Sequence, residues 1–139
     1  MFSPLKIQMF YNYLEPRKKD SHKYDYGHVL AVGGDYGFAG AIRLAGEAAL
    51  RTGAGVVSIA TRPEHICALN ASRPELMCHA ITNIDDMQKM ISHVNFILMG
   101  PGLGQQQWGK DLLDYVLLEY QGNLLIDADG LNNLALRSQ

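Results

Sequence analysis

A glycine-rich stretch offers the clearest chemistry in this sequence, because four of the eight residues from 33 to 40 are glycine. The stretch reads Gly33-Gly34-Asp35-Tyr36-Gly37-Phe38-Ala39-Gly40-Ala41, between an apolar run at 29–32 and a helix-like run at 42–51. A glycine-rich loop between a strand and a helix directs backbone N–H groups toward one point, where the positive end of the helix dipole also lies. Such a point suits a phosphate group. We therefore expect a nucleotide-like ligand, with Gly33, Gly34 and Gly37 as phosphate-loop candidates. A tight turn with close helix packing explains the same glycines, so both interpretations stay open.

The spacing of these glycines excludes two well-known nucleotide loops. No Gly-Lys-Ser/Thr closes the stretch, and glycines at 33, 34, 37 and 40 do not form G-x-G-x-x-G. The loop is therefore neither a Walker A loop nor a dinucleotide-binding fingerprint.

Two further groups follow predicted strands. Gly100-Pro101-Gly102-Leu103-Gly104 comes after an apolar run, and a later run ends in Asp127-Ala128-Asp129. In a parallel sheet both groups lie at the carboxyl edge, where open α/β folds bind ligands. The carboxylates could bind Mg²⁺, orient a ribose hydroxyl or act as a base, or one of them could cap the next helix. The second glycine loop could also be a rigid turn without a ligand.

A polar segment, 21–28, precedes the first predicted strand. Its Lys23 is a further phosphate-loop candidate, and His22 and His28 could titrate near neutral pH. The same segment could be a plain surface lead-in. Arg43 and Glu47 lie four residues apart and are expected to form a solvated ion pair, whereas Trp108 is expected to pack in the core.

Short apolar runs alternate with longer amphipathic segments, which is typical of βα units on a parallel sheet. We expect an α/β fold in three layers, with a largely parallel sheet between helices. The predicted strands are 28–32, 56–60, 76–81, 96–99 and 124–126, and the predicted helices are 41–52, 64–71, 84–93, 107–120 and 131–136.

Composition favours a globular protein. The 139 residues are 47% hydrophobic and 19% charged, with a formal net charge of −2 and a single short basic cluster at 17–19. Neither a disordered tail nor a nucleic-acid-binding protein fits these values. Cys67 and Cys78 lack metal-binding spacing, and no apolar run approaches a membrane span or a signal peptide, so we expect a reducing cytoplasm.

Taken together, these residues resemble the NAD(P)H-hydrate dehydratases of the ribokinase superfamily, over about residues 14–136. The matching segments are Ser21-His22-Lys23, Val32 to Arg43, Gly46 to Gly55, Arg73-Pro74-Glu75-Leu76-Met77, Gly100 to Gln105, and Asp127 to Asn132.

The resemblance implies repair of damaged nicotinamide cofactors. In this family, water added to the reduced ring of NADH or NADPH is removed at the expense of ADP or ATP, so ADP or ATP and Mg²⁺ are the implied cofactors. Because a hydroxyl leaves poorly, the family is understood to phosphorylate it and then eliminate phosphate. By resemblance, Ala41 and Gly102 line the hydrated dinucleotide, Gly40 and Gly104 shape the loops around it, and Asp127 and Asp129 form the acidic end of the substrate pocket. No metal ligand is predicted in this chain.

The sequence also departs from the family pattern. A second stretch with a His-Pro-Gly-Glu motif, a nucleotide segment and the catalytic aspartate is expected, and none of these motifs occurs in the 139 residues. Tyr24 and Gly130 stand where glycine and alanine are usual. We therefore expect residues 14–139 to be the N-terminal half of a dehydratase domain after an extension at 1–13, either self-associated or completed by a C-terminal half. A non-catalytic binding or assembly module and a small-molecule kinase of the same superfamily are the alternatives.

Overall fold

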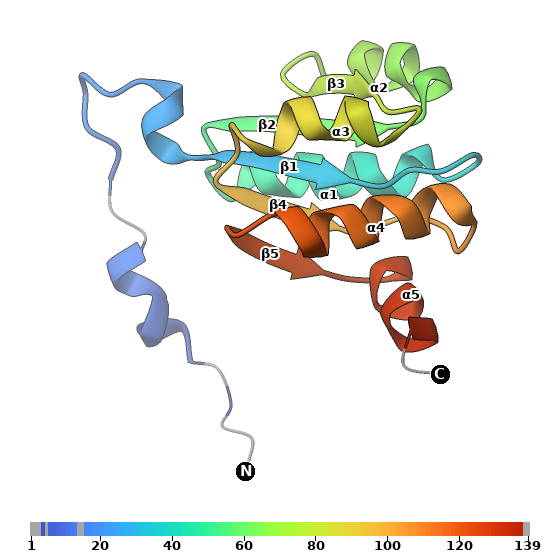
Figure 1. The fold of residues 1–139 in the computed structure, drawn as a ribbon. Helices are drawn as coiled ribbons and strands as arrows, with labels where there is room; N and C mark the ends of the chain where they lie inside the picture. The colour runs from blue at the N-terminus through green and yellow to red at the C-terminus, as the bar shows by residue number, and fades with distance from the viewer. Residues whose placement is uncertain (1–3, 5, 14–15, 138–139) are drawn as a thin grey trace.

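The structure, a computed structural model, describes residue 4 and residues 6–13 and 16–137. Its centre is a five-stranded sheet in the order β3-β2-β1-β4-β5, in which every neighbouring pair is parallel. Figure 1 shows the strands side by side with helices on both faces. The strands are β1 (His28–Val32), β2 (Val56–Thr61), β3 (Met77–Ala80), β4 (Phe96–Met99) and β5 (Asn123–Ile126).

Five α-helices connect or follow the strands, and the predicted α/β class is confirmed. They are α1 (Ala39–Arg51), α2 (Ile66–Ser72), α3 (Ile84–Ile91), α4 (Gln107–Glu119) and α5 (Asp129–Arg137). Strands β1 and β4 have the predicted bounds, while the other elements differ by a few residues at their ends. At α2, a 3₁₀ turn over Pro63–His65 precedes the α-helix, because proline fixes φ at the start of the turn.

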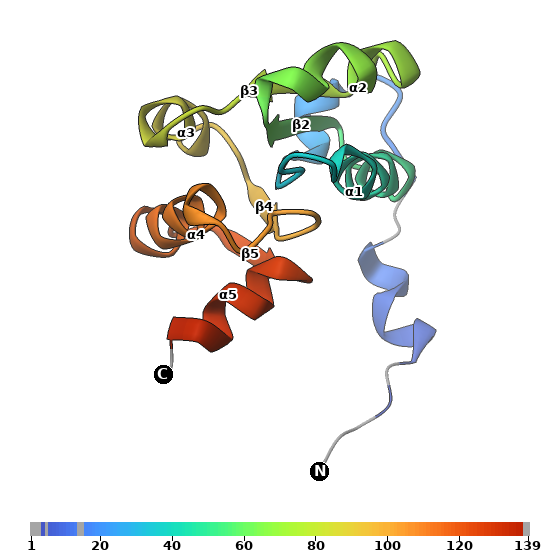
Figure 2. The same cartoon turned by 90° about the vertical axis from the view of Figure 1, so that its right-hand side faces the viewer.

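The sheet separates two apolar layers. Figure 2 shows α3 and α4 on one side of the strands and α1 on the other. Leu30 and Val32 of β1 face α3 and α4, whereas Ala31 between them faces α1 and α2. This alternation is the normal consequence of the two-residue repeat of a strand. Helix α1 approaches β2 closely at Gly46, where a Cβ atom would lie 3.0 Å from Ile59 Cδ1.

One part of the sheet has no helix over it within the described residues. On the α1 side of β4 and β5, Leu98 is only partly buried and Leu125 is 46% exposed. A groove of about 720 Å³ runs along this bare face, between α1 and β5. Parallel strands are normally buried on both faces, so the bare face is unusual for a finished sheet of this kind.

The first described residues lie apart from the sheet (Figure 1). A 3₁₀ turn, Ile7–Tyr13, exposes Ile7, Met9, Phe10 and Tyr11. Arg17 contacts the body, since its guanidinium donates to Gly53 O at 2.8 Å. The predicted boundary at residue 14 falls outside the described residues.

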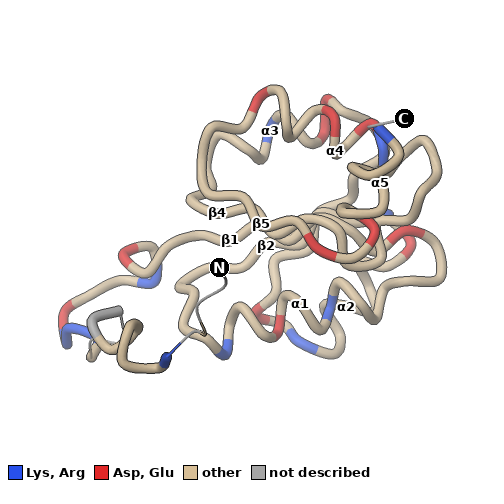
Figure 3. Tube along the Cα trace, turned by 90° about the horizontal axis from the view of Figure 1, so that it is seen from below, with Lys and Arg blue, Asp and Glu red and all other residues tan. Residues whose placement is uncertain are grey.

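Charge is spread over the surface. Figure 3 shows acidic and basic residues interleaved along the trace, with basic residues near the N-terminal segment. None of the helices in the described part combines the length and apolarity that crossing a bilayer requires.

Candidate functional site

The two glycine loops meet at the carboxyl edge of the sheet. The Gly34 amide donates to Pro101 O at 3.1 Å, and the Asp35 amide donates to Gly102 O at 2.6 Å. Gly33 lies so close to Pro101 that a Cβ atom there would overlap the proline carbonyl. Loops 67 residues apart in sequence therefore form one main-chain structure, as their positions after β1 and β4 predict.

Gly102 lies against the start of α1. It has a φ of +62°, and a Cβ atom added to it would lie 2.7 Å from Phe38 Cβ and 3.3 Å from Ala41 Cβ. Gly40, beside Ala41 in the first turn of α1, has open space at its Cβ position. The structure thus brings Gly40, Ala41 and Gly102 to one rim. The amides of a first helical turn favour an anion, although the Ala41 amide here already donates to Phe38 O at 3.1 Å.

The acidic strand end reaches the same rim. Asp127 follows β5, its amide donates to Met99 O at 3.0 Å, and its exposed side chain borders the end of the groove together with Pro101. Asp129 has a different environment, since its Oδ2 accepts the Gly104 amide at 3.0 Å. Asp127 therefore faces the open groove, while Asp129 stabilises the second glycine loop.

Gly104 is held from two positions on α5. Besides the bond to Asp129, its carbonyl accepts from Asn133 Nδ2 at 2.9 Å. Asn133 is 2% exposed, and its position on α5 was not singled out by the sequence. Its spacing of four residues from Asp129, one helical turn, is the signal that places both side chains beside one loop.

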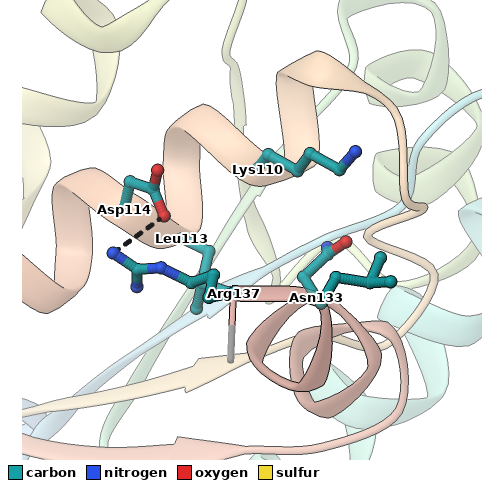
Figure 4. Close-up of a pocket in the computed structure, with 6 residues that line it drawn as sticks. Lys110, Leu113, Asp114, Asn133 and Arg137 are labelled. Carbon is teal, nitrogen blue, oxygen red and sulfur yellow. Dashed lines mark ion pairs between the residues drawn. The ribbon is translucent and has the colours of Figure 1, made fainter. Parts of the chain in front are cut away.

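A small pocket of about 180 Å³ lies between α4 and α5, on the other side of Asn133 (Figure 4). Lys110 and Asp114 line it from α4, and Arg137 from α5. Arg137 pairs with Asp114 at 3.3 Å, and both side chains are about half exposed. The pair joins the two helices, and the pocket lies away from the glycine rim.

Sequence reasoning missed an ion pair that borders the first glycine loop. Arg62 Nε donates to Asp35 Oδ1 at 2.7 Å, and the two side chains are only 16% and 10% exposed. Arg62 directly follows β2, so it belongs to the same carboxyl edge as the glycine loops. The sequence signal was the position of Arg62, as the first residue after a strand that neighbours β1.

Lys23 is not part of this rim, which corrects its prediction as a phosphate-loop residue. It begins a 3₁₀ turn, Lys23–Tyr26, ahead of β1, and its ammonium lies 5.3 Å from the Tyr24 ring. The glycine loop begins after the other end of β1. Because a strand of five residues spans roughly 16 Å, Lys23 cannot reach the loop from the amino edge.

His22 and His28, which were expected to titrate near neutral pH, also lie away from the rim. His28 Nε2 contacts Ser58 Oγ at 2.8 Å, and Ser58 Oγ contacts His79 Nε2 at 3.4 Å. Burial lowers the pKa of both His28 and His79, and a hydrogen bond with the His93 backbone partly offsets this for His28. His22 uses its backbone amide to bond Asp25 at 2.7 Å. These histidines stabilise the fold outside the candidate site.

Two minor expectations, on the Arg43–Glu47 ion pair and on Trp108, are confirmed. The ion pair between Arg43 and Glu47 is present at 2.8 Å, and it lowers the pKa of Glu47. Trp108 is 9% exposed and packs in the core as predicted. Among the described residues, no group of three or more His, Cys, Asp or Glu side chains is arranged to hold a metal ion.

The parallel sheet between two helical layers, with glycine loops at its carboxyl edge, defines a ribokinase-like α/β protein. A ribokinase-like superfamily protein from Enterococcus faecalis superposes with a TM-score of 0.82 at 27% identity, over 89% of this chain and 44% of that one.

The chain belongs to the NAD(P)H-hydrate dehydratase family, whose model matches residues 29–139. It is 50% identical over 122 residues to the bifunctional NAD(P)H-hydrate repair enzyme Nnr of Coxiella burnetii, covering 88% of this chain and 25% of that protein. The ADP/ATP-dependent NAD(P)H-hydrate dehydratase of Bacillus subtilis, co-crystallised with ATP/Mg²⁺, has a TM-score of 0.71 and 30% identity, over 85% of this chain and 43% of that one. The chain thus spans less than half the length of each of these proteins.

Proposed function

We propose that this chain supplies the dinucleotide-binding edge of an ADP/ATP-dependent dehydratase that restores NADH or NADPH from its 6-hydroxy, hydrated form. The observation that carries the proposal is the joined rim, where Asp35 and Gly102 bond at 2.6 Å and Gly102 lies beside Ala41. A rim of main chain without side chains lets the backbone approach a large, phosphate-bearing ligand. Membership of the dehydratase family supports hydrated NAD(P)H as that ligand.

The residues of this chain contribute binding and orientation. Gly40, Ala41 and Gly102 form the wall of the substrate site, and Gly104 keeps the second loop in place through Asp129. Asp127, at the open end of the groove, is the carboxylate available to a ligand hydroxyl. Loss of water from the hydrated ring requires conversion of the hydroxyl into a better leaving group, which is the role of ADP or ATP in the proposal.

Among the described residues, no group of three or more His, Cys, Asp or Glu side chains is arranged to hold a metal ion. Mg²⁺ commonly binds through one or two carboxylates together with the phosphates of a substrate, so in this proposal it would enter with ADP or ATP, and no step of the reaction is assigned to it here. The nucleotide site and the general base belong, in this proposal, to a second polypeptide segment such as the remaining length of the relatives provides. Residues 14–139 then act as the first half of the domain, after the extension at 1–13.

The bare face of β4 and β5 is the proposed seat of that segment. Among the described strands, β5 pairs with β4 alone, and Leu98 and Leu125 border an apolar groove. Covering this face would complete both layers of the sheet. A second copy of the chain could occupy the same face, which would make the protein a homo-oligomer. The free thiols of Cys67 and Cys78 are consistent with the proposed cytoplasmic location.

The proposal is tested by titrating NADPH hydrate into the chain alone, and then with a separately expressed C-terminal half of the Bacillus subtilis relative and ATP/Mg²⁺. Binding by the lone chain and dehydration in the mixture are expected, the latter followed by the return of NADPH absorbance. The Gly102→Ala variant, which fills the rim, should lose binding, whereas Asn83→Ala, at the start of α3, should retain it. Absence of both binding and complemented dehydration would refute the proposal.

A non-catalytic assembly module is the second candidate, and the apolar groove favours it. In that case the groove binds a partner chain, and the rim no longer takes a dinucleotide. Complex formation with the C-terminal half, without hydrate binding or dehydration, is the result that selects this alternative.

A further inference from the structure

The side chain of Arg62 is enclosed by aromatic rings. Its guanidinium carbon lies 4.2 Å from the centroid of Trp108 and 4.5 Å from the centroid of Tyr36. The Nε atom donates to Asp35 at 2.7 Å. Stacking and pairing together fix the plane of the guanidinium, which favours one orientation of the side chain.

Asp35 connects this arginine to both glycine loops. Its backbone amide donates to Gly102 O at 2.6 Å, so it already belongs to the joined rim. Its Oδ2 lies against Gly104, where an added Cβ atom would be only 2.9 Å away. The carboxylate that Arg62 holds therefore contacts the second loop as well as the first.

Trp108 gives the arginine a fixed support. The indole Nε1 donates to Ile81 O at 3.1 Å, and the ring is almost fully buried in the first turn of α4. The indole therefore gives the guanidinium a buried surface on which to stack. The series Trp108, Arg62 and Asp35 thus connects helix α4 to the two glycine loops.

We propose that Arg62 is a positioning residue, which fixes the separation of the two glycine loops by holding the Asp35 carboxylate against Gly104. The guanidinium itself need not touch the ligand. Its effect on ligand binding rests on the proposed function, whereas its effect on the loops does not.

Arginine suits this role better than lysine. Its planar fork stacks on both rings while Nε pairs with Asp35, and lysine offers a point charge without a stacking plane. Arg62→Met keeps an apolar stem between the rings and removes the ion pair. Arg62→Lys keeps the positive charge and removes the planar stacking.

The first experiment uses the whole chain without ligand. Amide hydrogen exchange should accelerate at Asp35 and Gly104 in Arg62→Met by roughly fivefold or more, while the core strand residues Leu30 and Ile97 keep their protection. Because Trp108 is the sole tryptophan, its fluorescence reports the same site, and its emission should shift to longer wavelength. Arg43→Met, which removes an ion pair of similar length on α1, should change neither signal.

Arg62→Lys separates charge from geometry and serves as the decisive variant where Arg62→Met does not fold. We expect it to keep the unfolding midpoint of the core closer to that of the parent chain, and still to accelerate exchange at Gly104. Unchanged exchange at both loop amides with unchanged Trp108 emission would overturn the proposal. So would equal acceleration at the loops and at the core strands, because that result indicates a general loss of stability.

The ligand arm repeats the titration with NADPH hydrate. If the parent chain binds, Arg62→Met should bind at least about tenfold more weakly, which corresponds to 1.4 kcal/mol. If Arg62→Met shows the ligand-free effects but the parent chain binds no hydrate, the result contradicts the proposed function and leaves the positioning role supported. Equal hydrate affinity in the parent and in Arg62→Met would refute the role in ligand binding.

Discussion

Substitution of Gly102 by alanine tests the close approach of the two loops most directly. The new Cβ would lie 2.7 Å from Phe38 Cβ and 2.9 Å from Phe38 O, and the residue would keep a φ of +62°. The left-handed backbone costs about 1–2 kcal/mol for a residue with a side chain. Overpacking adds about 1–3 kcal/mol, so Gly102→Ala should lower the free energy of unfolding by about 2–5 kcal/mol.

Gly37→Ala is the matched control, because Gly37 has a φ of +83° but no atom within 4 Å of its Cβ position. Gly37→Ala should therefore lower the free energy of unfolding only by the cost of the left-handed backbone, about 1–2 kcal/mol. The entropy that alanine removes from the unfolded chain is common to both variants and cancels in their difference. Urea unfolding followed by circular dichroism gives both free energies. Variants that agree within about 0.5 kcal/mol would show that the loops do not approach as described.

Three further predictions concern other parts of the molecule. Burial lowers the pKa of His28 and His79, so the unfolded chain takes up protons first as the pH falls below 6.5. The free energy of unfolding should then decrease by up to about 1.4 kcal/mol per pH unit for each proton, and His79→Asn should flatten this slope in urea titrations between about pH 8 and 5. Asn83→Ala removes the side-chain acceptor of the Asp86 amide at the start of α3 and should cost about 1 kcal/mol in thermal or urea unfolding. Leu125→Lys, on the bare face, should leave the unfolding midpoint nearly unchanged but prevent association with the C-terminal half in light scattering, and retained association would place the partner elsewhere.

The strands could be predicted from sequence because each forms a short apolar run between breakers. β1 and β4 are buried among other elements, so their hydrophobic runs coincide with the observed strands. At β5 the prediction began one residue late, since Asn123 is polar and lies at the uncovered edge. The position of the glycine loops followed from the parallel order of the strands.

The ion pair of Asp35 and Arg62 could not be predicted in the same way. The two residues are 27 positions apart and lie after different strands, so no local pattern relates them. The prediction for Lys23 failed for the opposite reason. Lys23 is close to the first loop in sequence, but the whole length of β1 separates the two in space. The sequence likewise could not predict that Asp127 borders the groove while Asp129 accepts the Gly104 amide, because this depends on the direction in which α5 leaves the sheet.

The strand order determines where a ligand can enter. The chain leaves β1 toward α1 on one side of the sheet, and it leaves β4 toward α4 on the other. Two adjacent connections that diverge in this way mark the point at which open α/β sheets bind ligands, whatever side chains they carry. Substitutions in the loops can therefore change which molecule is accepted, but the location of the opening is a property of the topology. New specificities in this scaffold should arise from loop changes at a constant place.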